Sequence, residues 1–229
     1  MNTNEVKAFF EKTDHYLTYN YNLRIRMETV GHFIGDTRYE AALDMPCGTG
    51  DISAPYIDQF ERLTLMDFSE KDSDKLTFIH GDFYAHDFGG SRYDLVMNIG
   101  ILAHIRDPWT FLEQSMALVK PGGTLILQST DSRHWFAKLI FTYLRMRRIA
   151  GIDKYALNKI PERELLEKVK AGGFVLERSF RYNQSFLGFS RLFSNELKYK
   201  LTQRYFGHAG QPLRQKSGSD VTYLFRKEG

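Results

Sequence analysis

Two carboxylates and a pair of glycines stand at the ends of the first two apolar runs of this chain. The first run ends at Asp44, and Gly48 and Gly50 follow in the turn Pro46-Cys47-Gly48-Thr49-Gly50. Glycine has no side chain and tolerates positive φ, so such a turn lets the backbone pass close to a ligand. The pattern predicts a strand, a nucleotide-binding turn and then a helix.

The second carboxylate is Asp67, which ends the apolar run 63–67. An acid at the tip of the second strand of an α/β unit can accept hydrogen bonds from both hydroxyls of a ribose. Its neighbour Phe68 could cover an adenine face. The glycine turn and Asp67 together therefore predict a nucleotide site rather than a simple tight loop.

Three further apolar runs, 76–80, 93–98 and 124–127, have the composition of buried strands. The turn Gly81-Asp82-Phe83 follows the first, Asn98 ends the second, and Lys120-Pro121-Gly122-Gly123 precedes the third. Five strands that each end in a polar residue indicate an α/β sheet, because a chance glycine loop would not be accompanied by them.

With these motifs in this order, the chain resembles the class I S-adenosylmethionine-dependent methyltransferases over residues 40–130. The stretch 44–50 is similar to the glycine-rich first motif of that family, Asp67 to its ribose-binding acid, and 81–83 to its adenine-contacting turn. The segment 94–104 with Asp107-Pro108 is similar to the fourth-strand region, and 118–125 to the turn into strand five. The chain looks most similar to small-molecule methyltransferases, including those of quinone and tetrapyrrole biosynthesis.

The resemblance implies a Rossmann-like, doubly wound α/β fold with a seven-stranded sheet, strand seven antiparallel, N-terminal helices and helical lid insertions. It also implies S-adenosylmethionine as cofactor, S-adenosylhomocysteine as product, and methyl transfer to oxygen, nitrogen or carbon of a small, aromatic or hydrophobic metabolite. The residues that it assigns to cofactor binding are Asp44, Pro46, Gly48, Gly50, Asp67, Phe68, Asp82, Phe83, Asn98 and Tyr21.

The chain departs from the family pattern at two places. Pro46 stands where a glycine is common, which removes one backbone donor. Only residues 69–75 separate the second and third strands, whereas a parallel crossover normally needs a dozen or more residues with a helix. Seven extended residues reach about 23 Å at most, so we predict that the usual helix is deleted, or absent from this numbering, which would open one flank of the adenine pocket.

Length and composition fit one soluble domain over residues 1–229, with a helical cap (1–38), a cofactor-binding core (39–130), a helical lid (131–160) and a C-terminal part of the sheet (161–229). The net charge of +3 is too small to predict nucleic-acid binding. The single cysteine, Cys47, excludes an internal disulfide and favours a reducing, cytoplasmic location. No histidine–acid cluster has the spacing of a metal site.

The cap and the lid each leave two interpretations open. By resemblance, Tyr16, Tyr21 or Arg24 could cover a sulfonium or pair with a methionine carboxylate, and the alternative is amphipathic packing. In the lid, the apolar residues of 135–144 predict a helix that roofs the substrate site, while its basic residues favour the alternative of peripheral membrane contact through 135–150. The lid helix is too interrupted by charge to span a bilayer.

The C-terminal part predicts a helix from Pro161 to Lys170 that stops at Gly172-Gly173, then a strand over 174–182, a helix over 187–206 and a last strand over 220–226. The two strands correspond to strands six and seven of the family, with strand seven inserted between five and six.

His104 is the predicted catalytic residue, because it follows the fourth strand and histidine side chains in general titrate near neutral pH. It would take a proton only from an acceptor that must lose one, such as a hydroxyl. The alternative is that His104 is a packing residue at the start of a helix.

Other functions fit the sequence less well. A cofactor-binding protein of the same fold could catalyse a cyclisation or act as a non-catalytic partner, and either a monomer or a homodimer is compatible with the chain. A nicotinamide dehydrogenase would have a third glycine where Ser53 stands. A base amino-methyltransferase would have an Asn/Asp-Pro-Pro-Tyr/Phe element in place of Asn98-Ile99-Gly100-Ile101.

Overall fold

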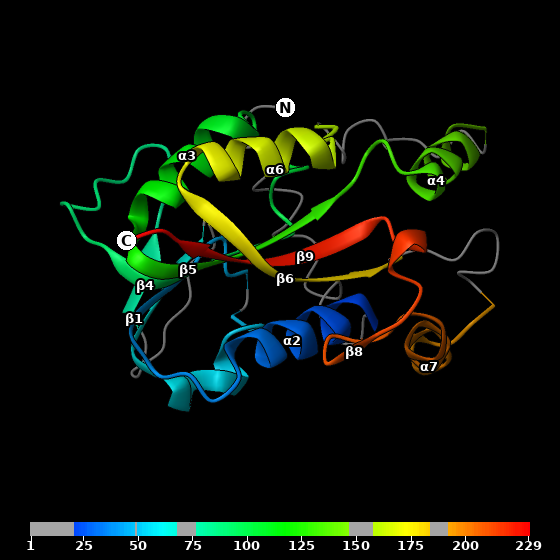
Figure 1. The fold of residues 1–229 in the computed structure, drawn as a ribbon, viewed down its shortest axis with the longest axis horizontal. Helices are drawn as coiled ribbons and strands as arrows, with labels where there is room; N and C mark the ends of the chain where they lie inside the picture. The colour runs from blue at the N-terminus through cyan, green and yellow to red at the C-terminus, as the bar shows by residue number, and fades with distance from the viewer. Residues whose placement is uncertain (1–20, 49, 68–76, 147–157, 184–191) are drawn as a thin grey trace.

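A computed structural model describes residues 21–48, 50–67, 77–146, 158–183 and 192–229. Its main feature is a seven-stranded sheet in the order β3-β2-β1-β4-β5-β9-β6 (Figure 1). The strands are β1 (Tyr39–Asp44), β2 (Phe60–Asp67), β3 (Thr77–His80), β4 (Tyr93–Ile99), β5 (Val119–Thr130), β6 (Phe174–Tyr182) and β9 (Asp220–Lys227). A separate hairpin joins β7 (Gly207–His208) to β8 (Gln211–Pro212).

Strand β9 is the antiparallel member of the sheet. It pairs antiparallel with β5 on one side and with β6 on the other, while β1 to β5 pair parallel to one another. The carboxyl ends of β1, β2 and β4 therefore meet at one edge, where ligands of open α/β sheets bind. The predicted fold class, including the inserted antiparallel strand, is confirmed.

Helices cover both faces of the sheet (Figure 1). Helices α3 (Pro108–Leu118) and α6 (Glu162–Ala171) lie on one face, and α2 (Tyr21–Ile34) and α7 (Asn195–Phe206) on the other. Each face carries its own buried apolar cluster, centred on residues such as Leu43 and Val96 on the first and Ala42 and Met97 on the second. Burial on both faces is the reason why the strands are continuous apolar runs in the sequence.

Local signals set the helix ends. The Asp107 side chain caps α3 by accepting from the backbone N–H of Trp109 and of Thr110, and Ser194 caps α7 by accepting from Leu197. Helix α6 follows Pro161 and ends before Gly172, as its sequence predicted. The last helix, predicted over 187–206, begins only at Asn195, because Ser194 is its N-cap and 192–194 are not helical; 184–191 lie outside the described residues.

Two predicted elements are wrong in detail. The helix expected after the glycine turn is a 3-10 segment, η1 (Ala54–Gln59), because Pro55 lacks a donor and Tyr56 leaves helical φ/ψ. The turn expected at 120–123 lies inside β5, at an irregularity in its pairing with β4.

Other predictions fall on residues that the structure does not describe. The predicted short link between the second and third strands falls within 68–76, between the end of β2 at Asp67 and the start of β3 at Thr77, and is not described. Phe68 and Tyr16 also lie outside the described residues. Helix α4 (Trp135–Met146) accounts for the first part of the predicted lid, and 147–157 are not described. Among the described helices, none has the length and apolar character needed to cross a membrane.

Candidate functional site

The glycine turn is closed onto the end of β2 by two hydrogen bonds. The Gly48 N–H donates to Asp67 Oδ2 over 2.7 Å, and the Cys47 N–H donates to the Met66 carbonyl over 3.0 Å. Gly48 has a φ of +56°, and a Cβ built on it would meet nothing within 4 Å. The turn therefore presents bare backbone toward open space beside a carboxylate.

Gly50 is a glycine for a different reason. Its φ is +78°, and a Cβ would lie 3.1 Å from Leu65 Cδ1 beneath the turn. Its N–H donates to the Cys47 carbonyl over 2.8 Å, which completes the turn. Gly50 thus shapes the turn, whereas Gly48 faces the open side.

Asp44 holds the residues that follow the turn through a hydrogen bond with Ser53. It is fully buried, and Ser53 Oγ donates to its Oδ2 over 2.6 Å. Burial raises the pKa of Asp44 to about 7, against the opposing effect of the Ser53 hydrogen bond, and the nearby charge of Asp67 adds to the rise. Asp44 is positioned to hold the start of η1 against β1 rather than to face solvent.

Asn98, near the end of β4, ties the neighbouring strand to this turn. Its Nδ2 donates to the Met45 carbonyl over 2.7 Å and to the Met97 carbonyl over 3.1 Å. The side chain is fully buried, yet its Oδ1 has no hydrogen-bond partner among the described residues. A buried acceptor normally has a hydrogen-bond donor, and the described part of the chain supplies none to this oxygen. Pro46, which follows a cis peptide bond with Met45, is half-buried in the same turn.

The predicted adenine turn lies beside Asp67. The Gly81 N–H donates to the Asp67 carbonyl over 3.1 Å, and a Cβ on Gly81 would meet nothing within 4 Å. Asp82 Oδ1 accepts from the Tyr84 N–H over 3.0 Å. Phe83 is buried, with its ring centroid 4.6 Å from that of Phe111, so its ring packs mainly into the core.

His104 lies in the loop that follows β4. Its N–H donates to the Ile101 carbonyl over 2.8 Å, and the residue is half-buried. Asn158 fixes this loop, because its Nδ2 donates to the carbonyls of Leu102 and Ile105 and its N–H to that of Ala103. Asn158 was not predicted, since no local motif marks a residue whose partners lie more than fifty positions away.

Arg26 is the second residue that the sequence did not reveal. A Cβ built on Gly100, just beyond β4, would lie 2.9 Å from Arg26 Nη1 and 3.3 Å from Gln128 Oε1. Burial raises the pKa of Tyr182 to about 12, and the charge of Arg26 opposes this rise. The guanidinium of Arg26 thus reaches from α2 to the carboxyl ends of β4 and β5.

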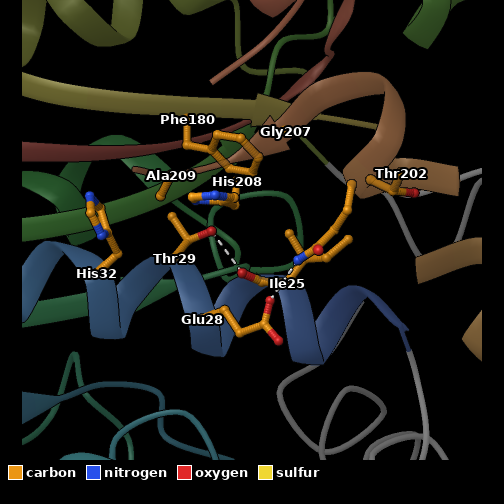
Figure 2. Close-up of a pocket in the computed structure, with 10 residues that line it drawn as sticks. Ile25, Glu28, Thr29, His32, Phe180, Thr202, Gly207, His208 and Ala209 are labelled. Atoms are coloured by element: carbon orange, nitrogen blue, oxygen red, sulfur yellow. Dashed lines mark hydrogen bonds between the residues drawn. The ribbon is translucent and has the colours of Figure 1, made fainter. Parts of the chain in front are cut away.

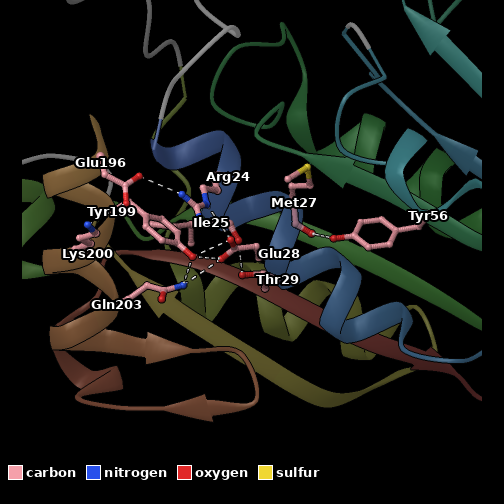
Figure 3. A network of polar contacts seen from close by, with 10 residues as sticks. All are labelled: Arg24, Ile25, Met27, Glu28, Thr29, Tyr56, Glu196, Tyr199, Lys200 and Gln203. Atoms are coloured by element: carbon pink, nitrogen blue, oxygen red, sulfur yellow. Dashed lines mark hydrogen bonds and ion pairs between the residues drawn. The ribbon is translucent and has the colours of Figure 1, made fainter. Parts of the chain in front are cut away.

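Arg24, which the sequence analysis gave as a candidate partner of the methionine carboxylate, points toward α7 (Figure 3). It pairs with Glu28 and Glu196, and its guanidinium lies 3.6 Å from the centroid of the Tyr199 ring. Glu28 also accepts from the Tyr199 hydroxyl, over 2.8 Å, and from Gln203 Nε2, over 3.1 Å. These contacts join α2 to α7.

Tyr21 stands at the first turn of α2. Its ring is buried in the second apolar cluster, and its hydroxyl donates to the Asn183 carbonyl over 3.5 Å. Burial raises the pKa of Tyr21 far above its ordinary value. The packing alternative describes the position of Tyr21, and its role toward a cofactor stays a prediction.

A cavity of about 230 Å³ lies between α2, α7, β6 and the β7–β8 hairpin (Figure 2). Ile25 and Phe180 give it apolar walls, and Glu28, His32 and His208 are among its polar residues. It is separate from the glycine turn, none of whose residues line it.

The structure brings Asp44, Gly48, Gly50, Asp67 and Asn98 together at one sheet edge, with Asp82 beside them. Among the described residues, no group of three or more His, Cys, Asp and Glu side chains could hold a metal ion.

Comparison with known proteins also identifies methyltransferases as similar to this chain. A family model described as a methyltransferase domain matches residues 19–179. A demethylmenaquinone methyltransferase of Renibacterium salmoninarum is 29% identical over 111 residues, which cover 45% of each chain. A ubiquinone biosynthesis O-methyltransferase of Parvibaculum lavamentivorans is 28% identical over 134 residues, 49% of this chain and 53% of the relative. The chain thus spans about half the length of these curated relatives.

Solved structures share the fold over nearly the full length. The N-methyltransferase NodS of Bradyrhizobium japonicum, in complex with S-adenosylhomocysteine, has a TM-score of 0.63 and 11% identity, covering 99% of this chain and 98% of that one. The 1,6-didemethyltoxoflavin-N1-methyltransferase of Burkholderia thailandensis has a TM-score of 0.61 and 17% identity, covering 99% and 86%. Because the family model matches more than half of the chain and the sheet has the expected order, this protein belongs to the methyltransferase domain family, in its class I fold.

Proposed function

We propose that this protein transfers a methyl group from S-adenosylmethionine to oxygen, nitrogen or carbon of a small, aromatic or hydrophobic metabolite. The observation that carries the proposal is the Gly48–Asp67 contact at the carboxyl edge of the sheet. It sets bare backbone and a carboxylate side by side, as an adenosine group requires. The names of the curated relatives support an acceptor of the quinone class.

The residues present fit this cofactor. Gly48 and Gly81 both face open space on either side of Asp67, and the buried Asn98 Oδ1 supplies an acceptor without a partner among the described residues. The short η1 does not offer the strong anion site of a helix N-terminus. S-adenosylmethionine has no phosphate, so its one anionic group, the methionine carboxylate, would need a partner elsewhere in the site.

We assign residues to the ribose, the adenine and the methionine carboxylate of the cofactor. Asp67 would bind the ribose hydroxyls, because the two oxygens of a carboxylate can accept several hydrogen bonds, of which the Gly48 N–H supplies one to Oδ2. Asp82 would flank the adenine. Phe83 would adjoin it at the same turn although its ring packs mainly into the core, and Phe68, outside the described residues, stays a prediction for the other face. Arg26, at the carboxyl ends of β4 and β5, would pair with the methionine carboxylate.

S-adenosylmethionine supplies a methyl group already activated on a sulfonium. The protein's task is therefore to orient the acceptor and exclude water. His104 would accept a proton from a hydroxyl acceptor, and Asn158 would hold its loop in place. We propose a soluble, cytoplasmic monomer or homodimer without nucleic-acid partners.

Calorimetric titration with S-adenosylmethionine and S-adenosylhomocysteine tests the cofactor. We expect micromolar binding that Asp67→Ala weakens by about 1–3 kcal/mol, through loss of a charge-assisted pair of hydrogen bonds. Asp87→Ala, in an exposed loop, is the control. Unchanged affinity of Asp67→Ala would contradict the ribose assignment, and a product without the mass of one added methyl would favour a cyclisation or another non-methylating reaction.

The Arg26 assignment has its own test. Arg26→Met should lower the affinity for S-adenosylhomocysteine by about tenfold or more, because an ion pair is lost. Its affinity for 5′-methylthioadenosine, which lacks the amino-acid part, should stay as in the wild type. Equal losses for both ligands would show that Arg26 only supports the fold.

A further inference from the structure

The exposed face of α4 carries three large apolar residues. Trp135 is 60% exposed, Leu139 44% and Met146 71%. At about 100° per residue these positions fall within about 40° of one another around the helix, so they form one stripe. Ala137 is buried on the opposite side, against the body of the protein. The stripe is thus a side of α4 that the described part of the chain leaves uncovered.

The segment that contains α4 is basic in sequence. Between residues 132 and 152 the sequence contains no Asp or Glu. The basic residues of that segment are Arg133, Lys138, Arg145, Arg147 and Arg148. Arg133 is paired with Glu164, whereas Lys138 is exposed and has no ion-pair partner among the described residues. A helix with a tryptophan-containing apolar stripe and a basic flank matches the interface of an anionic bilayer.

Helix α4 lies at the same end of the sheet as the proposed cofactor site. The helix follows the end of β5 at Thr130 and lies at the carboxyl end of the sheet, where the cofactor site is proposed (Figure 1). A bilayer against the stripe would therefore lie at the same end of the sheet as the proposed cofactor site.

We propose that the stripe Trp135, Leu139 and Met146 docks this protein peripherally on an anionic lipid surface. The protein would then take up a hydrophobic acceptor from the bilayer. That second step rests on the proposed function, whereas the lipid contact itself does not.

Sedimentation of the full chain with vesicles tests the contact. The vesicles consist of phosphatidylcholine alone or of equal amounts of phosphatidylcholine and phosphatidylglycerol. We expect partition onto the mixed vesicles, weaker partition onto the neutral ones, and loss of binding as salt is raised. Leu139→Ser should lower the partition coefficient about tenfold, because an inserted apolar side chain is lost.

Leu176→Ser is the matched control. Leu176 is 42% exposed, close to the value for Leu139, but lies in the first half of β6, away from α4 (Figure 1). It should leave partition unchanged, and both variants should keep the wild-type melting temperature within a few degrees. Equal partition of the two variants, or no partition of the wild type, overturns the proposal.

A second copy of the chain is the competing occupant. A wild-type dimer that Leu139→Ser converts to a monomer, without vesicle binding, would assign the stripe to self-association and overturn the lipid contact. Binding of S-adenosylhomocysteine without vesicle binding rejects only the lipid surface. Vesicle binding without cofactor binding rejects only the proposed function.

Discussion

The turn after β1 depends on two acids in opposite environments. Asp44 is fully buried beneath the turn, while Asp67 is half-buried and takes the Gly48 N–H. The ordinary pKa of Asp44 is 3.8, and burial, the first cause, raises it to about 7. Burial therefore favours the protonated form of Asp44 beneath the turn.

This shift makes stability depend on pH. The native state keeps the Asp44 proton up to a pH of about 7, whereas the unfolded state loses it near 3.8, so stability falls as pH rises between these values. Asp44→Asn keeps an acceptor for Ser53 and has no proton to lose. Urea unfolding at both ends of this range should therefore show a decline, of up to a few kcal/mol, that is larger in the wild type than in the variant. Parallel declines in both proteins would contradict the assignment.

The two arginines of α2 show what the sequence could and could not predict at this scale. Asp44, Gly48, Gly50 and Asp67 were predictable, because each ends a strand or forms a turn next to one. Arg24 and Arg26 differ by two positions, which places them on different sides of the helix. Only the packing of α2 shows that Arg26 reaches the sheet while Arg24 reaches α7.

At the scale of elements, α7 is joined to α2 by polar contacts. The link is the network of Glu28 with Arg24, Tyr199 and Gln203 (Figure 3). Desolvation, with the hydrogen bond to Glu28, raises the pKa of Tyr199 to about 12. The Tyr199 hydroxyl thus acts as a donor throughout the physiological pH range.

Removing that donor should loosen the contact between the two helices. Tyr199→Phe leaves Glu28 with fewer donors and should cost about 1–2 kcal/mol of unfolding free energy. Arg163→Ala removes an exposed pair with Glu167 on α6 and should change stability by less than about 0.5 kcal/mol. Chemical denaturation measures both, and an equal effect of the two substitutions would show that the network adds nothing beyond surface pairing.

The elements of the sheet were more predictable than the segments between them. Strands β6 and β9 and helix α6 were located closely from alternation, Pro161 and Gly172, which are local signals. The helix expected after the glycine turn failed because Pro55 and a short connection favour a 3-10 segment. Asn158 escaped prediction, since its partners lie on a loop far away in sequence.

At the scale of the whole molecule, β9 joins β6 to the five parallel strands of the sheet. Six of its eight residues are buried, and it pairs along its length with β5 and β6. Lys227, near its end, donates to the carbonyls of Met116 and Val119, which ties the strand to the end of α3. Without β9, strand β6 has no neighbour in the sheet.

Deleting residues 220–229 should therefore abolish cooperative folding, because both strands and their burial are lost. Circular dichroism during heating should show no sharp transition, whereas deletion of residues 228–229 alone should preserve one. A truncated protein that melts cooperatively would show that β1 to β5 and their helices are stable without the inserted strand.

The insertion of β9 also has a consequence during synthesis on the ribosome. Strands β5 and β6 are translated well before the strand that separates them, so the edge of β5 stays unpaired until β9 emerges. In that interval a nascent chain presents an apolar, hydrogen-bonding edge to any other chain nearby. The pairing of distant segments also slows the final step. The order of the strands along the chain thus leaves one sheet edge open to association until the last strand is made.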